Sequence, residues 1–114
     1  MIEVGTDIVS VKRIRKSLDS QGERFEKRVF SDWEIQFCRE YSDFAVRFAG
    51  RFAAKEAVIK ILKDENPDVS MKEVEIRVTK TGRPEVLFLG KKTEIAVSIS
   101  HCEEYATATA VREK

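Results

Sequence analysis

A run of small residues in the middle of the chain restricts the folds that are open to it. Alanine and glycine recur through RFAGRFAAKEAVIKIL at residues 47–62, inside a helix that we predict over 44–63 with Asp43 as its N-cap. A strand predicted near the other end of the chain carries three alanines on one face, Ala106, Ala108 and Ala110. Small residues on both surfaces permit close backbone approach, so we expect this strand to pack directly on the long helix.

Periodicity and turn residues divide the rest of the chain into short elements. Apolar residues at helical spacing predict helices at residues 11–20, 32–41 and 44–63. Alternating apolar residues predict strands at residues 2–10, 73–79, 85–90, 94–100 and 105–112. Residues 23–30 fit a turn or a short helix, and Ser31 with Glu34 forms a capping box for the next helix. We therefore predict an α+β fold in one domain, residues 1–114, with the long helix packed on an antiparallel sheet.

Charge is unevenly distributed along a chain that is almost neutral overall. The net charge is +1, yet residues 11–30 carry seven basic and three acidic side chains, a local charge of +4. Such a segment is either a solvated helix face or a surface for an anionic partner. The near-zero total argues against a nucleic-acid binder, as does the helical rather than strand spacing of the aromatic residues.

Other features of the sequence indicate a cytoplasmic protein. No apolar run approaches the roughly 20 residues of a membrane span. The N-terminal residues predict a strand and do not resemble a signal peptide. Cys38 and Cys102 show no metal-ligand spacing, and we expect both to be reduced thiols.

Two carboxylates stand out because each lies in a mainly apolar element. Asp7 follows VGT in the first strand, and Glu56 lies in the alanine-rich helix. Mg²⁺ prefers carboxylate oxygens and accepts phosphate oxygens in the rest of its shell. The same helix carries a neighbouring stripe of cations suited to phosphate groups, Arg47, Arg51 and Lys55. The spacing equally permits a plain surface ion pair between Glu56 and Lys60.

A second group of polar residues lies in the C-terminal hairpin. Ser98 and Ser100 share one face of their predicted strand, and His101, the only histidine, is predicted to begin the turn 101–104. Hydroxyl groups next to a histidine can bind an anion, although lone polar residues in turns commonly serve the backbone. The stretch TGRP, containing Gly82, likewise fits a plain turn or a ligand contact. The pattern does not support a Ser-His-Asp hydrolase.

Taken in order along the chain, these stretches resemble one enzyme family. VGTDIVSVKRI, RFAGRFAAKEAVIKIL, GRP and SISHCEEYATATAV match the pattern of bacterial holo-[acyl-carrier-protein] synthases, which are group I 4′-phosphopantetheinyl transferases. The match covers nearly the whole chain, and G-x-D combined with F-x-x-K-E-A is specific to that superfamily. The resemblance implies the 4′-phosphopantetheinyl transferase fold. It also implies transfer of 4′-phosphopantetheine from coenzyme A to a serine of apo acyl carrier protein, releasing adenosine 3′,5′-bisphosphate, in support of fatty acid biosynthesis.

The resemblance also implies roles for individual positions. Asp7 and Glu56 match Mg²⁺ ligands, Lys60 matches a phosphate contact, and these three match the catalytic residues. The other positions that match coenzyme A contacts are Arg51 near the 3′-phosphate and adenine, Gly82, Arg83 and Pro84 in the turn beside the adenine, and Ser98, Ser100 and His101 at the phosphates. A water on the metal and Glu56 itself are both candidates to accept the serine proton.

Partners follow from the same resemblance. Arg13, Arg24 and Arg28 match basic positions that dock the acidic carrier protein, and similar members assemble as homotrimers with sites between subunits. The loop 63–71, KDENPDVSM, departs from many relatives because it is acidic and contains no glycine. From the residues alone, the alternative to an enzyme is a basic-patch domain that binds an acidic protein without chemistry.

Overall fold

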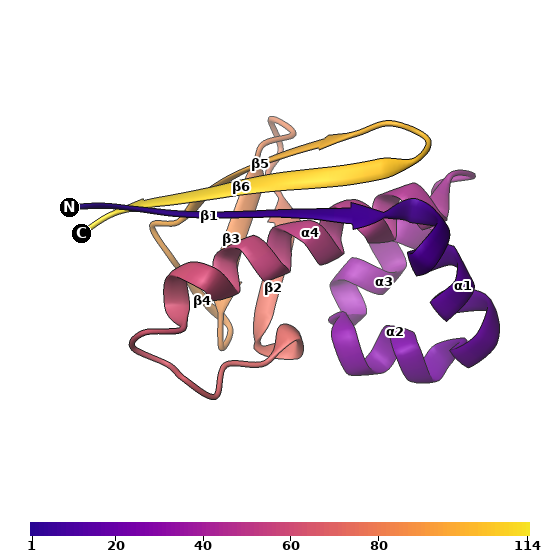
Figure 1. The fold of residues 1–114 in the computed structure, drawn as a ribbon, viewed down its shortest axis with the longest axis horizontal. Coiled ribbons are helices and arrows are strands. Elements are labelled where there is room, and N and C mark those ends of the chain that lie inside the picture. Colours follow the sequence, from indigo (N-terminus) through magenta and orange to yellow (C-terminus); the bar gives the residue numbers. More distant parts are fainter.

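The computed structural model describes all 114 residues and arranges them around one long helix. In chain order the elements are β1 (Ile2–Ser10), α1 (Val11–Gln21), α2 (Glu23–Val29), α3 (Asp32–Arg39), α4 (Phe44–Leu62), the 3₁₀ turn η1 (Met71–Glu73), β2 (Val74–Val78), β3 (Pro84–Phe88), β4 (Lys91–Lys92), β5 (Ala96–His101) and β6 (Tyr105–Glu113). Figure 1 shows β1 and β6 side by side along α4, with α1, α2 and α3 gathered at one end of it. The predicted α+β class, with a long helix on antiparallel strands, is confirmed.

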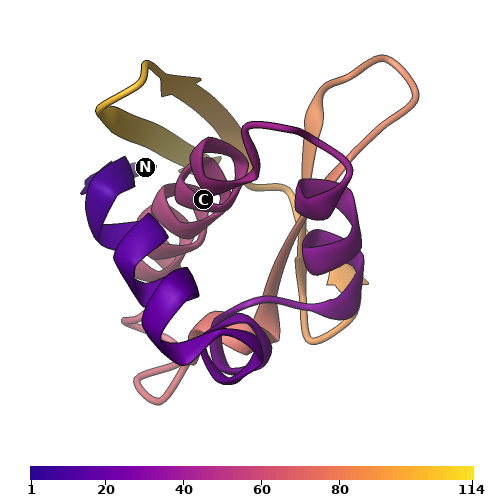
Figure 2. The same cartoon turned by 90° about the vertical axis from the view of Figure 1, so that its right-hand side faces the viewer.

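The strands form two sheets rather than the single antiparallel sheet that the sequence predicted. One sheet has the order β1-β6-β5, the other has the order β2-β3-β4, and each contains three strands. Figure 2 shows the β2–β3 hairpin in orange and the β5–β6 hairpin in yellow as separate projections. α4 contacts both sheets, through β1, β5 and β6 on one and β2 on the other. Alternation of apolar residues shows which face of a strand is buried, but it does not show which other strand it pairs with. The number of sheets was therefore not predictable from this alternation.

Close packing between the alanine strand and α4 is confirmed. Ala108 and Ala110 of β6 are buried in one apolar cluster with Ala57 of α4, and Ala106 is buried in the adjoining cluster. β1 approaches α4 equally closely at Gly5, where an added Cβ would lie 2.0 Å from the carbonyl oxygen of Ala57. Only glycine allows β1 to lie against α4 at this point.

Most predicted boundaries agree with the structure to within one or two residues, but η1 and β4 were not predicted, and two further details differ. His101 is the last residue of β5 and pairs with Ala106, so it is not part of the turn as predicted. Asp43 occupies the N-cap of α4, but its carboxylate accepts from Nε of Arg47 at 3.4 Å and from no backbone amide. A competing side-chain cation therefore replaces the predicted cap interaction. Residues 23–29 form a short helix, which decides between the two alternatives for that segment.

The capping box at the start of α3 is confirmed, and its glutamate has a further role. Oγ of Ser31 accepts from the amide of Glu34 at 3.2 Å, and Oε1 of Glu34 accepts from the amide of Ser31 at 2.9 Å. The same carboxylate accepts from Nζ of Lys55 at 2.5 Å and from the amide of Ile76 at 2.7 Å. Both charged side chains are fully buried. This Glu34–Lys55 junction ties α3, α4 and β2 together.

The acidic loop 63–71 closes one end of the core. Val69 packs against the apolar cluster beneath α4. Oε1 of Glu65 accepts from Arg112 at 3.0 Å and also from Lys114, both at the end of the chain. The loop is therefore held to β6 and its C-terminal extension by ion pairs.

Candidate functional site

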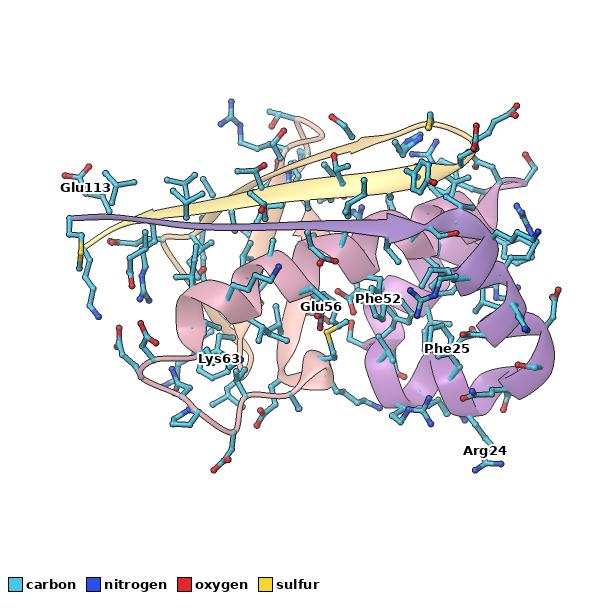
Figure 3. All side chains as sticks on the ribbon, in the orientation of Figure 1. Arg24, Phe25, Phe52, Glu56, Lys63 and Glu113 are labelled. Atoms are coloured by element: carbon cyan, nitrogen blue, oxygen red, sulfur yellow. The ribbon has the colours of Figure 1, made fainter.

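Asp7 and Glu56 line a common cleft between β1, α1, α2 and α4. This carboxylate cleft has a volume of about 280 Å³, and its lining also includes Arg13, Phe25 and Phe52. Figure 3 shows Phe52 and Glu56 on the same side of α4, near Phe25 of α2. Asp7 reaches the cleft because it lies on the face of β1 that packs on α4. The fold thus brings together two carboxylates from elements far apart in the sequence.

The carboxylate of Glu56 forms no ion pair in the structure, although Arg13 also lines the cleft. Burial, together with the negative charge of Asp7, raises the pKa of Glu56 above its usual range. The alternative predicted from spacing, an ion pair between Glu56 and Lys60, is not formed. Nζ of Lys60 instead donates to the carbonyl oxygen of Thr6 at 2.6 Å and lies 3.7 Å from Oδ1 of Asp7. A cation bound between the carboxylates would relieve their repulsion.

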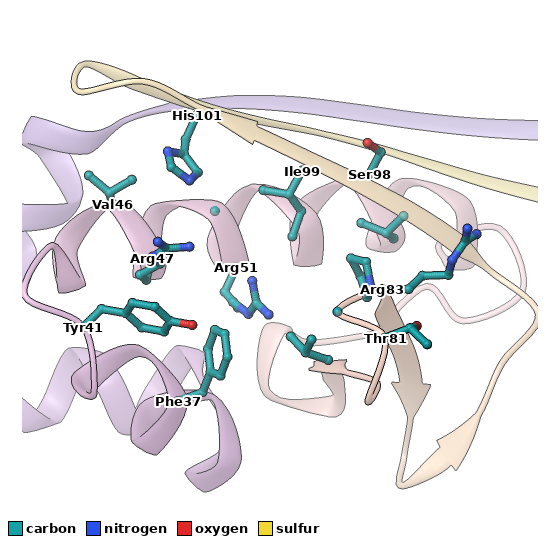
Figure 4. Close-up of a pocket in the computed structure, with 15 residues that line it drawn as sticks. Phe37, Tyr41, Val46, Arg47, Arg51, Thr81, Arg83, Ser98, Ile99 and His101 are labelled. Carbon is teal, nitrogen blue, oxygen red and sulfur yellow. The ribbon is translucent and has the colours of Figure 1, made fainter.

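A larger pocket lies on another side of α4. It has a volume of about 810 Å³ and is walled by the α3–α4 connection, α4, the β2–β3 turn and β5. Figure 4 shows Arg47, Arg51, Arg83 and His101 around it, and none of its lining residues is acidic. We call it the arginine pocket. It gathers six of the positions predicted to bind coenzyme A: Arg51, Gly82, Arg83, Pro84, Ser98 and His101.

The arginine pocket and the carboxylate cleft are separate within one chain. They share no lining residue. Arg51 and Glu56 are five residues apart on α4, and a helix turns by about 100° per residue, so the two side chains leave it about 140° apart. A single chain therefore does not bring Arg51 together with Asp7, Glu56 and Lys60.

Ser98 and Ser100 lie on the opposite face of β5 from Ile99 and His101. Figure 4 shows the hydroxyl of Ser98 pointing away from Arg51. Three rows that cross all three strands lie in the middle of the exposed side of this sheet, and we call them the outer sheet face: Val4–Val111–Ala96, Thr6–Thr109–Ser98 and Ile8–Thr107–Ser100. No residue in these rows is charged. Of the eight positions predicted to bind coenzyme A, Ser100 and Lys60 line neither the cleft nor the pocket, and Lys60 lies instead beside Asp7.

The three arginines predicted to dock a carrier protein are all exposed on α1 and α2. Arg13 also lines the carboxylate cleft, which places this basic surface beside Asp7 and Glu56. Figure 3 shows Arg24 pointing outward from α2. Arg28 donates to Oε1 of Gln21 at 2.9 Å, a contact that keeps its charge at the surface.

Known proteins similar to this chain come from one group of enzymes. The sequence model of the 4′-phosphopantetheinyl transferase superfamily matches residues 3–110. A holo-[acyl-carrier-protein] synthase of Leptospira biflexa is 43% identical, over 97% of this chain and 95% of its own length. This chain belongs to the holo-[acyl-carrier-protein] synthase family.

Solved structures of holo-[acyl-carrier-protein] synthases share the fold. The synthase of Neisseria meningitidis superposes with a TM-score of 0.85 at 30% identity, over 100% of both chains. The synthase of Bacillus anthracis in complex with coenzyme A (3′,5′-ADP) gives a TM-score of 0.77 at 34% identity, over 95% of this chain and 92% of that chain. The expected holo-[acyl-carrier-protein] synthase fold is therefore confirmed.

The sequence prediction misses two features of this synthase-family chain. Lys55, expected to offer its charge to phosphates, is fully buried in the Glu34–Lys55 junction, so that prediction is wrong. Its position among core-facing alanines was the signal that it faces inward. Phe37 and Tyr41 line the arginine pocket beside Arg47. The spacing of those aromatic residues is typical of an ordinary core face, and no local pattern distinguishes a pocket wall from a core.

Proposed function

We propose that this chain transfers 4′-phosphopantetheine from coenzyme A to a serine of apo acyl carrier protein, in support of fatty acid biosynthesis. The products are holo acyl carrier protein and adenosine 3′,5′-bisphosphate. The observation that carries the proposal is the arginine pocket, which has arginine and histidine but no acidic residue in its lining. Its volume of about 810 Å³ suits a small-molecule ligand. Its charge suits a nucleotide with several phosphate groups.

Coenzyme A is proposed to place its nucleotide in the arginine pocket. Arg51 is assigned to the 3′-phosphate end and His101 to the phosphates. The turn Gly82, Arg83 and Pro84 is assigned to the adenine. Gly82 has a φ of 86°, a backbone conformation that glycine adopts without strain, so the turn geometry supports a close approach to a ligand.

Asp7 and Glu56 fit the Mg²⁺ ion that the family implies. They are hard oxygen donors from different elements, and burial together with the charge of Asp7 raises the pKa of Glu56, a shift that a bound cation would reverse. No group of three or more His, Cys, Asp or Glu side chains forms a metal site in the structure, so water and phosphate oxygens are proposed to complete the shell. When bound, the ion would neutralise and orient the pyrophosphate.

Positioning and charge neutralisation carry most of a phosphoryl-type transfer. The serine oxygen bonds to the β-phosphorus, and the bond from that phosphorus to the bridging oxygen breaks as adenosine 3′,5′-bisphosphate leaves. The serine proton is released in the same reaction. Lys60, held by the carbonyl oxygen of Thr6 beside Asp7, is proposed to offset the negative charge that shifts onto the leaving group.

We further propose a homotrimer in which a neighbouring subunit completes each site. The separation of the arginine pocket from the carboxylate cleft supports this arrangement. The outer sheet face is uncharged, and Val4 and Ile8 on it are 59% and 63% exposed. A pocket of about 370 Å³ connects Asp7 and Lys60 with Thr107 and Thr109 on that face. A subunit packed there would lie beside the carboxylates and would contact Ser98 and Ser100.

The basic surface on α1 and α2 is proposed to dock the acidic carrier protein. Arg13 of this surface lines the carboxylate cleft, so a docked carrier would present its serine near the reacting centre. Association steered by charge weakens as salt rises.

None of the helices has both the length and the apolar character that crossing a membrane requires. We propose a cytoplasmic location and one transferase domain over residues 1–114, which the two free thiols and the match over residues 3–110 support.

One assay tests the reaction directly. The protein is mixed with apo acyl carrier protein, coenzyme A and Mg²⁺, and the carrier is weighed by mass spectrometry. We expect the mass of one phosphopantetheine group to be added. Glu56→Ala and Asp7→Ala should abolish the transfer while circular dichroism shows an intact fold. An unmodified carrier with the unaltered protein would refute the proposed function, and full activity in either variant would remove that residue from the metal site.

Subunit mixing tests the composite site. Arg51→Ala and Glu56→Ala chains, each inactive alone, are unfolded together and refolded as a mixture. If a site takes Arg51 from one subunit and Glu56 from another, mixed trimers will regain part of the activity. A mixture that stays inactive, or a protein that sediments as a monomer, contradicts the shared site.

Charge reversal tests the docking surface. Arg13→Glu combined with Arg28→Glu should raise KM for the carrier more than it weakens coenzyme A binding, because both side chains lie outside the arginine pocket. Equal loss of carrier and coenzyme A binding would contradict this assignment.

A further inference from the structure

Three aromatic rings follow one another along α3 and its connection to α4, and each is covered by an arginine. Trp33 and Phe37 stack with 5.1 Å between ring centroids and 10° between planes, and Phe37 meets Tyr41 at 5.3 Å. The arginine carbons lie over these rings at 5.7 Å for Arg77 on Trp33, 4.5 Å for Arg51 on Phe37 and 4.1 Å for Arg47 on Tyr41. Figure 4 shows the Phe37–Arg51 and Tyr41–Arg47 contacts in the wall of the arginine pocket.

Arg51 differs from the other two arginines because it has no acidic partner. Arg77 pairs with Glu75 and Arg47 pairs with Asp43. Arg51 forms no ion pair, is only 7% exposed, and has a buried Nε that donates no hydrogen bond. A buried cation without a hydrogen-bonded partner is unstable on its own, so its charge is available to an anion in the pocket.

The groups around Arg51 hold it in place without neutralising it. The carboxylate of Glu34 is engaged by Lys55 in the Glu34–Lys55 junction. Burial raises the pKa of the Cys38 thiol to about 12, so this neighbour stays uncharged near neutral pH. The face of Phe37 attracts the guanidinium through its ring quadrupole and fixes its plane, yet it does not compete for the N–H donors.

We propose that Phe37 is a positioning residue, which orients the unpaired guanidinium of Arg51 toward a phosphate group of the bound nucleotide. The inference rests on the proposed function and adds to it a residue from α3. An aromatic ring suits this role better than a carboxylate, since a carboxylate would bind the same donors that the phosphate needs.

Nucleotide binding measured by calorimetry tests the role, with adenosine 3′,5′-bisphosphate and adenosine 5′-monophosphate as probes. Phe37→Leu should weaken binding of the bisphosphate about tenfold, a loss typical of a desolvated cation–π contact. Phe37→Tyr keeps a ring under Arg51 and should bind within about twofold of the unaltered protein. Phe37→Glu should weaken binding further than Phe37→Leu, because the new carboxylate would pair with Arg51.

Trp33→Leu provides the matched control. Trp33 belongs to the same row of rings but does not line the arginine pocket, so its loss should leave nucleotide affinity within about twofold. In the transfer assay, Phe37→Leu should raise KM for coenzyme A and leave kcat and the KM for the carrier unchanged. The two probes show which phosphate Arg51 contacts. If Phe37→Leu weakens binding of the monophosphate and the bisphosphate equally, Arg51 is directed to the 5′-phosphate. If it weakens binding of the bisphosphate alone, Arg51 is directed to the 3′-phosphate, and either result supports the proposal.

Two results would overturn it. Unchanged nucleotide affinity in both Phe37→Leu and Phe37→Glu would mean that Arg51 is oriented without the ring. Equal losses in Trp33→Leu and Phe37→Leu would mean that the row of rings only stabilises the fold. Transfer by the unaltered protein tests the proposed function separately, so a failure of the one is distinguishable from a failure of the other.

Discussion

Lys55 and Glu56 are neighbours in the sequence, yet they lie in two regions of opposite electrostatic character. Lys55 is fully buried against the fully buried Glu34, with 2.5 Å between Nζ and Oε1. Glu56 is half-buried in the carboxylate cleft, where burial and the charge of Asp7 raise its pKa. The Glu34–Lys55 junction pairs opposite charges, whereas in the carboxylate cleft Glu56 lies near a second carboxylate and forms no ion pair.

The difference separates charge that serves the fold from charge that is available to a ligand. A buried pair of opposite sign, with its hydrogen bonds made inside the chain, needs no further partner. Two carboxylates in one cleft are stabilised by an added cation. Arg51 follows the second pattern with the sign reversed, because a ring and no carboxylate lies against it. Uncompensated charge thus marks both halves of the proposed site.

Breaking the junction is expected to have the largest effect on stability. Lys55→Met leaves the buried carboxylate of Glu34 without its cation, and we expect a loss of about 3–5 kcal/mol in the free energy of unfolding. Urea denaturation measures this change. Lys60→Met is the matched control, since the side chain of Lys60 is 52% exposed, and it should change stability by less than about 1 kcal/mol. Similar losses in the two variants would contradict the distinction between the regions.

A substitution that moves the two carboxylates of the cleft apart should have the second largest effect on stability. Gly5→Ala forces β1 away from α4, because the new Cβ would lie 2.0 Å from the carbonyl oxygen of Ala57. We expect a loss of about 1–3 kcal/mol, together with weaker Mg²⁺ binding as Asp7 moves from Glu56. Gly50→Ala is the control, since its Cβ would meet only the side chain of Ile99 at 3.2 Å. A Gly5→Ala protein with unaltered stability would show that β1 can shift freely.

Binding of Mg²⁺ in the carboxylate cleft should stabilise the folded protein. At ten times its Kd, Mg²⁺ should raise the free energy of unfolding by about 1.4 kcal/mol in the unaltered protein. Asp7→Asn and Glu56→Gln should lose this gain, whereas Arg51→Met should retain it, because Arg51 lies outside the cleft. The measurement is thermal unfolding with and without Mg²⁺, and a gain that persists in Asp7→Asn would speak against the metal site.

The smallest expected effect concerns Glu56 in metal-free buffer. Because the pKa of Glu56 is raised on folding, its ionised form destabilises the folded state at neutral pH. Glu56→Gln should therefore stabilise the protein by a few tenths of a kcal/mol at pH 7, since solvent screens a half-exposed group. The gain should disappear as the pH falls through the raised pKa into the usual carboxyl range. Urea denaturation at both pH values measures it, and destabilisation at pH 7 would show that Glu56 has a favourable partner.

Local pattern was sufficient for several elements of the fold and the site. The capping box at Ser31 and Glu34, the alanine face of β6 and the helix over residues 44–62 all depend on neighbours within a few residues. The resemblance to the synthases supplied Asp7 and Glu56 as a pair, since their spacing alone left Glu56 equally suited to a surface ion pair. In the structure the two carboxylates line one cleft, and Lys60 donates to the carbonyl oxygen of Thr6 and lies beside Asp7.

What the sequence by itself determined is the position of most helices and strands, the close approach of β6 to α4 and the family. Only the tertiary structure decided that the strands divide into two sheets, that Lys55 joins Glu34 across 21 residues of sequence, and that Arg51 and Glu56 open onto different sides of α4. The reason is physical. Periodicity tells which side chains share a face of one element, whereas partners and exposure depend on what other elements pack against that face.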